Sequence, residues 1–375
     1  MPLHSGRAPR YLFERMVRLS REIIAYMVGE FGQLEALRRL SDPHWFQALG
    51  CVLGFDWHSS GLTTTVCGAL KQGLRGTEKE IGIHVAGGKG AASRRTPAEI
   101  TASCDRLGRE PDSLIYASRI SAKVDSAAVQ DGYQLYHHTF FFTSGGAWCV
   151  VQQGMSDETA MARRYHWLSE TLESYVNEPH SAVCGESAAA TLNLVADASR
   201  EVRAASASLA AGAPEVTLEA LAGLPHLSMP RRHAIAAADI NPHYLRKILL
   251  RTYEAAPGNF EALLSIEGVG AKTLRALALT SELIYGISAS RQDPARFSFA
   301  HGGKDGTPYP VDRQTYDKTI EVMHDALNRA HVGRSEKIGA FRRLADFADP
   351  SQEGRHGPGG AKARFPSKPA HGTKV

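Results

Sequence analysis

The sequence predicts an α+β protein that is mostly helical, with a central β-hairpin region and a C-terminal helix-hairpin-helix domain. Apolar residues recur at steps of three and four through most of the chain, as they do on the buried face of a helix. Only LYHHTFFFT and AWCVVQQGM, joined by Ser144-Gly145-Gly146, have the composition of paired strands. Two apolar helical runs within residues 263–286 meet at a short hairpin that contains two glycines.

Domain organisation follows from length and from shifts in composition. A chain of 375 residues is long enough for two or three domains, each with its own core. We expect a helical N-terminal domain with the β-hairpin region over residues 1–200, an Ala- and Ser-rich linker with a helical portion over 201–223, and a helix-hairpin-helix domain over 224–349. Residues 350–375 should form a disordered basic tail, since they are rich in Gly, Pro, Lys and Arg.

The overall charge limits how the protein can bind nucleic acid. The formal net charge is only +4, so a basic coat is absent and any DNA contact must come from local patches and backbone amides. No run of about 18 apolar residues exists, and the N-terminus lacks the apolar segment of a secretory signal. We therefore expect a cytoplasmic, nucleoid-associated protein without a membrane partner.

The cysteines give no sign of a metal site. All five are widely spaced, no two stand at a metal-ligand spacing, and most lie in apolar runs. The expectation is a set of reduced core thiols, with no metal and no cofactor.

The N-terminal part of the chain is predicted to be helical. Residues 10–40 have the spacing of one or two amphipathic helices, with an interruption at Gly32. Ser41-Asp42-Pro43 marks the start of the next helix, because an acidic cap precedes a proline in the first turn.

That helix leads to a polar segment with three candidate site residues, Asp56, His58 and Ser59. A carboxylate, an imidazole and a hydroxyl are the groups of a nucleophilic site. Close neighbours at a helix end point in different directions, however, so capping or contact with a substrate is the alternative.

A glycine-rich segment follows. The GGKG sequence at residues 87–90 includes Lys89 and precedes Arg94 and Arg95, so flexible backbone and three cations occur together. Such a loop can hold a phosphate, and a mobile surface loop is the alternative. The TPAE sequence at residues 96–99 predicts a capping box and a helix that ends near residue 107.

Two interpretations stay open for four polar residues of the central hairpin. They are His137 and His138 on the first strand and Gln152 and Gln153 on the second. They can belong to a hydrolytic or nuclease site, or they can satisfy one another's hydrogen bonds at a domain junction. Residues 114–122 are expected to lead into the hairpin, and residues 156–176 to form a helix after it.

The hairpin at residues 267–270 has the sequence of a clamp for DNA phosphates. Its two glycines permit a positive φ and let a phosphate approach the amides that open the next helix. The residues expected to bind the backbone of duplex DNA are Gly268, Val269, Gly270, Lys272, Thr273 and Arg275. The alternative is an αα-hairpin whose glycines serve only a tight turn.

A long segment rich in proline and glycine, residues 287–313, follows the hairpin module. Its length indicates a functional loop. Lys304 and Asp305, set among glycines, suggest an element that closes over a ligand, and the alternative is a loop that prolines hold on the surface. A last pair of helices is predicted over residues 314–347.

One resemblance covers most of the chain. Over about residues 3–347, the segments SDPHWFQALGCVLGFDWHSSG, GGKGAASRRTPAEI, DGYQLYHHTFFFTSGGAWCVVQQGM and DPARFSFAHGGKDGTPYPVDRQTYD resemble a bacterial and archaeal family catalogued as domain of unknown function 763. This resemblance implies no particular activity.

A second resemblance is local. GVGAKT and PYPVD, within about residues 260–320, are similar to the helix-hairpin-helix/Gly-Pro-Asp superfamily of DNA glycosylases. In bifunctional members the hairpin lysine attacks C1′ of the sugar as a Schiff-base nucleophile, and the aspartate stabilises the cationic transition state. The resemblance places these roles on Lys272 and Asp312. If the two form one site, we expect them to meet across a cleft lined by cations such as Lys304 or Arg313.

Three functions follow as expectations. The resemblance implies a DNA glycosylase/AP lyase that acts on damaged bases. A nuclease or hydrolase in the N-terminal half is the first alternative. The second is a non-catalytic DNA-binding subunit that a DNA-repair partner protein recruits.

Overall fold

The structure, a computed structural model, describes residue 3 and residues 8–55, 59–186, 191–222, 242–296 and 313–348. Several predicted site residues lie outside these ranges: Asp56, His58, Lys304, Asp305 and Asp312. The segments predicted over 224–241 and 350–375 lie outside them as well.

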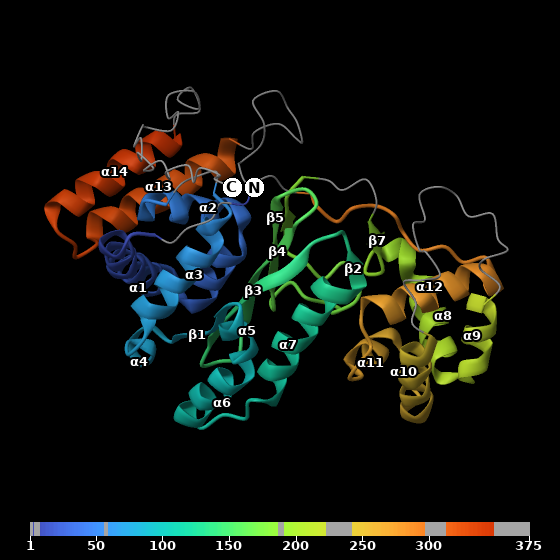
Figure 1. Ribbon diagram of the computed structural model, residues 1–375. Helices are drawn as coiled ribbons and strands as arrows, with labels where there is room; N and C mark the ends of the chain where they lie inside the picture. The colour runs from blue at the N-terminus through green and yellow to red at the C-terminus, as the bar shows by residue number, and fades with distance from the viewer. Residues whose placement is uncertain are drawn as a thin grey trace, which may run out of the picture.

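A five-stranded antiparallel sheet stands at the centre of the described chain (Figure 1). Its order is β1-β3-β4-β5-β6. The strands are β1 (Ile83–Lys89), β3 (Gln134–Thr143), β4 (Trp148–Ser156), β5 (Met161–Leu168) and β6 (Ala182–Cys184). β3 and β4 form the predicted hairpin, in which Phe141 pairs with Cys149 and His138 pairs with Gln152.

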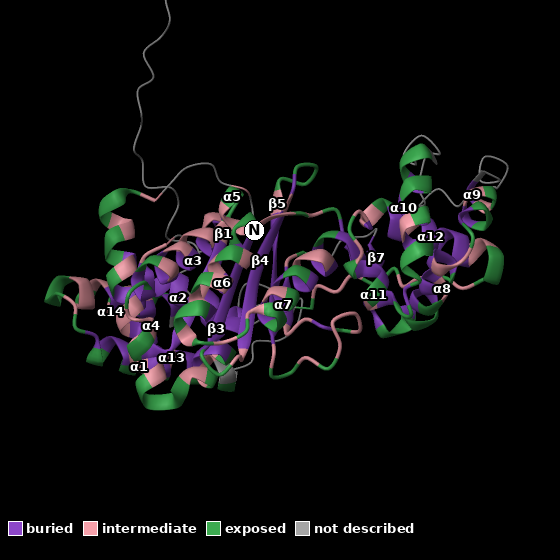
Figure 2. Ribbon diagram, turned by 90° about the horizontal axis from the view of Figure 1, so that it is seen from below, coloured by how far each residue is buried: buried purple, intermediate pink, exposed green. Residues whose placement is uncertain are grey.

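Helices cover both faces of this sheet because both faces are apolar. Side chains alternate between the two faces along a strand. Phe141 and Cys149 belong to one core, whereas Phe140 and Phe142 belong to the other. Figure 2 shows the buried colour running through the strands and through the helices on either side of them. The sheet therefore separates two hydrophobic cores and contributes side chains to both.

The first core lies between the sheet and the N-terminal helices. α1, α2 and α3 pack there, and the C-terminal pair α13 and α14 packs on α1 and α2 (Figure 1). The helices of this part are α1 (Arg10–Ser41), α2 (Pro43–Leu53), α3 (Gly61–Leu74), α4 (Glu78–Ile81), α13 (Arg313–Arg329) and α14 (Arg334–Ala348). The last helix pair thus forms as predicted, but against the N-terminal helices.

The second core extends from the other face of the sheet into a helical bundle. α6, α7 and the π-helix η1 adjoin the sheet, and α12 packs against α8, α9 and η1. The elements of this part are α5 (Ala91–Arg94), α6 (Thr96–Leu107), α7 (Asp112–Lys123), η1 (Val124–Ala128), β2 (Val129–Gln130), β7 (Leu192–Asn193), η2 (Asp197–Ser199), α8 (Arg200–Ala211), α9 (Pro214–Ala222), α10 (Pro242–Ala255), α11 (Phe260–Ser265) and α12 (Ala271–Tyr285). Residues 201–222, expected within a linker, therefore form packed helices.

The start of the chain follows the local sequence signals. α1 contains one residue outside helical geometry, Gly32, with φ 84° and ψ 168°. Asp42 caps α2, since its Oδ1 accepts hydrogen bonds from the amides of His44 at 2.7 Å and Trp45 at 3.0 Å. Pro43 occupies the first turn, where no amide donor is needed. The predicted interruption and the predicted cap are both confirmed.

The helix predicted over residues 156–176 is wrong, because most of its first half is strand β5. A strand buried on both faces has no alternation of polar and apolar residues. β5 is also unusual in that it contains the fully buried Arg163 and Arg164. Two adjacent arginines suggested a solvated helix, whereas hydrogen bonds inside the protein accommodate both of them.

The capping box predicted at residues 96–99 is also wrong, although the helix ends at Leu107 as expected. Glu99 does not turn back to its own helix. Its Oε2 accepts hydrogen bonds from the Gly87 amide at 2.8 Å and from Lys71 Nζ at 2.6 Å. This tertiary contact ties α6 to β1 and α3, and a local sequence pattern does not contain it.

No described helix is long and apolar enough to cross a membrane. All five cysteines are buried free thiols, as predicted. Within the described ranges, His, Cys, Asp and Glu side chains form no cluster of three or more that could hold a metal ion.

Candidate nucleic-acid interface

The hairpin between α11 and α12 is built from local backbone preferences. Asn259 caps α11 through a 2.8 Å hydrogen bond from the Ala262 amide to its Oδ1. Gly268 has φ 89°, a conformation that favours glycine, and a Cβ there would lie 2.5 Å from Ile248 Cδ1. Val269 is buried and anchors the turn in the second core. Ile248 on α10 thus occupies the space where a side chain at position 268 would lie.

The second glycine has a different role. Gly270 is extended, with φ −138°, and a Cβ built on it would meet no atom within 4 Å. It precedes α12 without a side-chain cap, so the first amides of a 15-residue helix are left for an outside acceptor. Lys272, in this first turn, is exposed. An anion can therefore approach the start of α12 at Gly270.

The other predicted contacts of the hairpin are partly occupied inside the protein. Thr273 is 3% exposed and packs in the core. Arg275 is half-buried and donates from Nε to Gln130 Oε1 at 2.8 Å. Of the predicted set, Gly270 and Lys272 remain the groups open to a ligand.

Three hydrogen bonds hold this hairpin against the sheet-side helices. Tyr116 donates to Glu261 Oε1 at 2.5 Å, and Lys123 Nζ donates to the Ile266 carbonyl at 3.1 Å. Gln130 Nε2 donates to the Ala271 carbonyl at 2.9 Å. The hairpin is therefore fixed relative to α7, η1 and β2, although about 140 residues separate them in the sequence.

A groove of about 680 Å³ lies where these elements meet. Residues of α5 and α6, α7, β3 and the hairpin line it. Its charged side chains are Arg94, Arg119, Lys123 and Glu267, and both arginines are exposed. The polar residues most relevant to chemistry are Ser118, His137 and His138. We call this site the central groove.

A chain of buried hydrogen bonds ends at the central groove. Ser118 Oγ lies 2.9 Å from His138 Nε2, and His138 Nδ1 lies 2.9 Å from Gln152 Oε1. Gln152 Nε2 donates to Asp125 Oδ2 at 2.6 Å. The four side chains are at most 6% exposed, and we call them the His138 network. Burial lowers the pKa of His138, against the opposing effects of Gln152 and Asp125, so the imidazole is held towards its neutral form.

Asp125 is held firmly. Its Oδ2 also accepts a hydrogen bond from Trp167 Nε1 at 3.0 Å, and its Oδ1 lies 2.5 Å from His180 Nε2. Asp125 stands in η1, and π-helical turns are rare and often occur at functional sites. The change from α7 to η1 directs this carboxylate to the buried end of the His138 network.

The hairpin residues have features of both interpretations. His138 and Gln152 bond to each other, as the structural interpretation requires. His138 also reaches Ser118 at the groove, as a catalytic site requires. His137 is separate from this chain, because its Nε2 lies 2.9 Å from Thr139 Oγ1. Burial, aided by His138 and nearby lysines, lowers the pKa of His137 to about 3.

The GGKG segment is an ordered part of the sheet, so the predicted mobile loop is wrong. Gly87, Gly88 and Lys89 belong to β1 and pair with β3. A Cβ at Gly87 would lie 2.2 Å from the His138 carbonyl oxygen, so the close pairing requires glycine. Lys89 Nζ lies 5.6 Å from the centre of the Tyr136 ring.

The remaining predicted residues are scattered or undescribed. Ser59 is buried and accepts a hydrogen bond from the Gly61 amide at 3.2 Å, a local contact just before α3. Arg94 lines the central groove, whereas Arg95 is exposed and lies 4.0 Å from Glu99. Arg313 begins α13, a helix that packs on α1, α2 and α14. The predicted pairing of Lys272 with Asp312 is not tested, because Asp312 lies outside the described residues.

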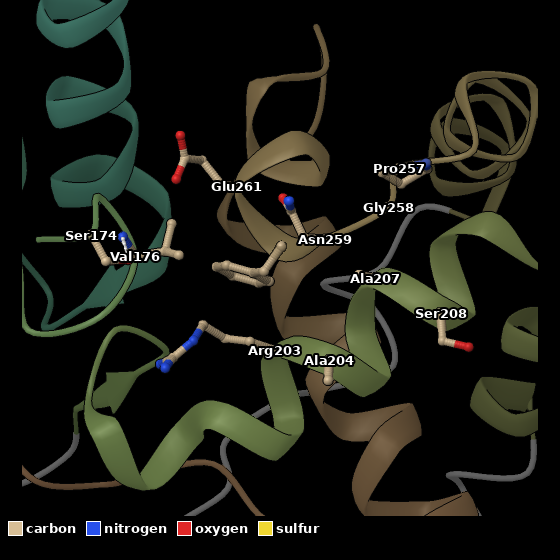
Figure 3. A pocket seen from close by; sticks show the side chains of 11 residues that line it. Ser174, Val176, Arg203, Ala204, Ala207, Ser208, Pro257, Gly258, Asn259 and Glu261 are labelled. Atoms are coloured by element: carbon tan, nitrogen blue, oxygen red, sulfur yellow. Dashed lines mark hydrogen bonds between the residues drawn. The ribbon is translucent and has the colours of Figure 1, made fainter.

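A second cavity, of about 490 Å³, lies between α8 and the start of α11 (Figure 3). Its polar side chains serve the fold. Arg203 donates to the carbonyls of Leu194 and Ala196, Asn259 caps α11, and Glu261 accepts from Tyr116. This cavity is therefore a weaker candidate than the central groove.

Comparison with known proteins identifies a family. Residues 1–311 match the family described as "Protein of unknown function (DUF763)". The chain belongs to the DUF763 family. No curated protein and no solved structure matches this DUF763 protein. The family assignment confirms the resemblance over most of the chain, whereas the resemblance to DNA glycosylases stays a prediction.

Several residues of the site were not predicted from the sequence: Ser118, Arg119 and Lys123, which line the groove, and Asp125 at the buried end of the His138 network. A signal for Ser118 was present. Leu114, Ala117, Ser118 and Ser121 share the buried face of α7 at helical spacing. Buried hydroxyls need hydrogen-bond partners. Ser121 donates to the backbone carbonyl of Ser118, whereas Ser118 pairs with His138. Asp125 had no comparable signal, because its position depends on the π-helical turn.

Proposed function

We propose that this DUF763 protein binds duplex DNA through the sugar-phosphate backbone, at the α11–α12 hairpin and the adjoining central groove. The observation that carries the proposal is the uncapped, unobstructed start of α12 at Gly270, beside the exposed Lys272. Helix amides and a nearby cation are a common way to hold a phosphate.

The groove supports the same ligand. Arg94 on α5 and Arg119 on α7 add two exposed cations, and Lys123 adds a third that is half-buried. Glu267 is the acidic side chain among the groove's lining residues. This local excess of positive charge suits a polyanion, although the net charge of the chain is only +4.

The proposal includes no chemistry at Lys272. Schiff-base catalysis needs a desolvated lysine with a carboxylate nearby. Lys272 is exposed, and no hydrogen bond or ion pair to another residue within the described ranges involves it. Backbone binding requires only the charge and position of Lys272, and both are present.

Salt dependence of binding tests the proposal. Each cation that neutralises a phosphate adds about 0.9 to the slope of log affinity against log salt concentration. Lys272→Ala should lower that slope by about this amount and weaken binding equally for two unrelated duplex sequences, measured by fluorescence anisotropy. Lys79→Ala on α4 is the control and should change neither quantity. A wild-type protein without measurable duplex affinity at low salt would overturn the proposal.

A further inference from the structure

We propose that Ser118 is a nucleophile that attacks the phosphorus of a phosphodiester bound in the central groove, with His138 as its general base. This inference rests on the proposed function in one respect, because the phosphodiester is taken to be the DNA backbone. It goes beyond that function by assigning a hydrolytic step to side chains outside the hairpin.

The hydrogen bond to Asp125 determines which ring nitrogen of His138 bears the proton. A carboxylate accepts hydrogen bonds, so the amide nitrogen of Gln152 faces Asp125 and the amide oxygen faces His138. That oxygen can only accept, so Nδ1 of His138 is the nitrogen that bears the proton. In a neutral imidazole Nε2 is then unprotonated, and it accepts the hydroxyl hydrogen of Ser118 at 2.9 Å.

This is the arrangement that activates a hydroxyl. A serine needs a base within hydrogen-bond distance, and the base needs a third group to hold its orientation. His138 is the base, and Gln152, fixed by Asp125, is the positioning residue. Ser118, which is 3% exposed, and His138 both line the central groove, so the groove is the side from which a phosphate would approach the hydroxyl oxygen.

The cations of the groove select the class of substrate. Arg94 and Arg119 can neutralise the non-bridging oxygens of a phosphate, which carry charge as the bond to serine forms. Lys123 also lines the groove. It is five residues after Ser118 on the same helix, about 7.5 Å along the axis and about 140° around it, and its Nζ donates to the Ile266 carbonyl at 3.1 Å. Burial lowers the pKa of Lys123, although Glu267 opposes the shift, and a lowered pKa suits an ammonium that gives up a proton.

In the first step the Ser118 oxygen forms a bond to phosphorus and its proton passes to His138 Nε2. The opposite phosphorus–oxygen bond breaks, and the leaving oxygen takes a proton from Lys123. In the second step water loses a proton to Lys123 and attacks phosphorus. The bond to Ser118 then breaks, and His138 returns the proton to the serine. The sum is one phosphodiester and one water converted to a phosphomonoester and an alcohol.

A fluorophosphonate probe tests the nucleophile without DNA. The serine oxygen displaces fluoride from such a probe and keeps the phosphonyl group. We expect the wild-type protein to be labelled, and peptide mapping by mass spectrometry to place the label on Ser118. Ser118→Ala should lose the label, whereas Ser113→Ala, which removes an exposed serine of the same helix outside the groove, should keep it. Because mapping uses the wild-type protein, the test does not depend on whether a variant folds.

Two more variants separate catalysis from structure. Ser118→Ala should lower the hydrolysis of bis(p-nitrophenyl) phosphate at least about 100-fold. Gln152→Leu should lower the limiting rate of labelling while the probe concentration at half-maximal rate stays unchanged, because it affects the base and not the probe contacts. A wild-type protein that is unlabelled at Ser118 overturns the proposal.

Duplex binding, measured separately by anisotropy, distinguishes this inference from the proposed function. Labelling at Ser118 without duplex affinity would support the nucleophile and contradict DNA as its substrate. Duplex affinity without labelling at Ser118 would leave the proposed function intact and contradict the nucleophile.

Discussion

Two buried hydrogen-bond networks on neighbouring strands differ in one decisive way. The Arg163 network consists of Arg163 on β5 with Asp131 at 2.8 Å and Asp293 at 2.9 Å, and all three side chains are at most 3% exposed. The His138 network is equally buried, but it ends at the central groove. Burial and hydrogen bonding therefore do not by themselves identify a site. The His138 network differs in that its last member, Ser118, lines the central groove.

The Arg163 network has a structural task. Arg163 also donates to the Glu186 carbonyl. Because Glu186 precedes α8 in the chain and Asp293 follows α12, Arg163 connects β5 to the segments at both ends of the helical bundle. Burial alone lowers the pKa of Arg163, but Asp131 and Asp293 raise it above its ordinary value. The guanidinium thus remains charged in the interior. Its removal leaves a buried carboxylate without its main partner.

The largest effect on stability should come from a substitution in the Arg163 network. Arg163→Leu should lower the free energy of unfolding by about 3–5 kcal/mol, because it strands Asp131 as a buried charge. Urea denaturation at pH 7 measures the loss. The control is Arg200→Leu, which removes an exposed ion pair with Asp197 and should leave the free energy of unfolding nearly unchanged, because solvent screens that pair. Equal losses in the two variants would contradict the assignment of a structural role to Arg163.

His137 on β3 should make the free energy of unfolding depend on pH in the acid range. The pKa of His137 is about 3 in the folded protein, below its unfolded value of about 6.5. Between these values the unfolded state binds more protons, so the free energy of unfolding falls as the pH falls from about 6.5 towards 3. At about 1.4 kcal/mol per pH unit, His137 contributes a loss of about 2 kcal/mol between pH 6.5 and pH 5.

His137→Gln should remove this contribution. Urea denaturation of both proteins at pH 7 and pH 5 gives the comparison, and the variant should lose about 2 kcal/mol less than the wild type over that interval. The same acid sensitivity in both proteins would mean that His137 titrates normally and is not buried as the structure has it.

The smallest stability effect concerns the two hairpin glycines. Gly268→Ala should cost about 1–2 kcal/mol, because its φ is 89° and the new Cβ would collide with Ile248. Gly270→Ala should cost less than about 0.5 kcal/mol, since its φ is negative and the space beside it is open. Thermal unfolding measures both. A large loss at Gly270 would show that this position serves folding and would weaken the case for an anion there.

Local signals in the sequence predicted much of the fold. The kink at Gly32, the cap at Asp42 and the β3–β4 hairpin each depend on a few neighbouring residues, and all three are confirmed. β5 was mistaken for a helix because a strand covered on both faces has no alternating pattern. The packing of α13 against α1 was equally beyond local signals, since about 300 residues separate them.

The candidate site was predicted in pieces. His138, Gln152, Arg94 and the hairpin glycines were each selected from the sequence as separate candidates. What brings them near one another is the docking of α11–α12 on α7 through Tyr116, Lys123 and Gln130, a set of long-range contacts. Ser118 was missed because its partner lies on a strand twenty residues away, and a hydroxyl alone carries little information.

Lysine reactivity in the presence of DNA tests the binding surface most directly. Acetylation of the full-length protein, read by mass spectrometry with and without saturating duplex, reports which side chains the duplex covers. We predict that Lys272 and Lys123 become protected, because they lie at the hairpin and in the central groove, while Lys79 on α4 reacts at the same rate. Unchanged reactivity of Lys272 at saturation would contradict DNA binding at the α11–α12 hairpin.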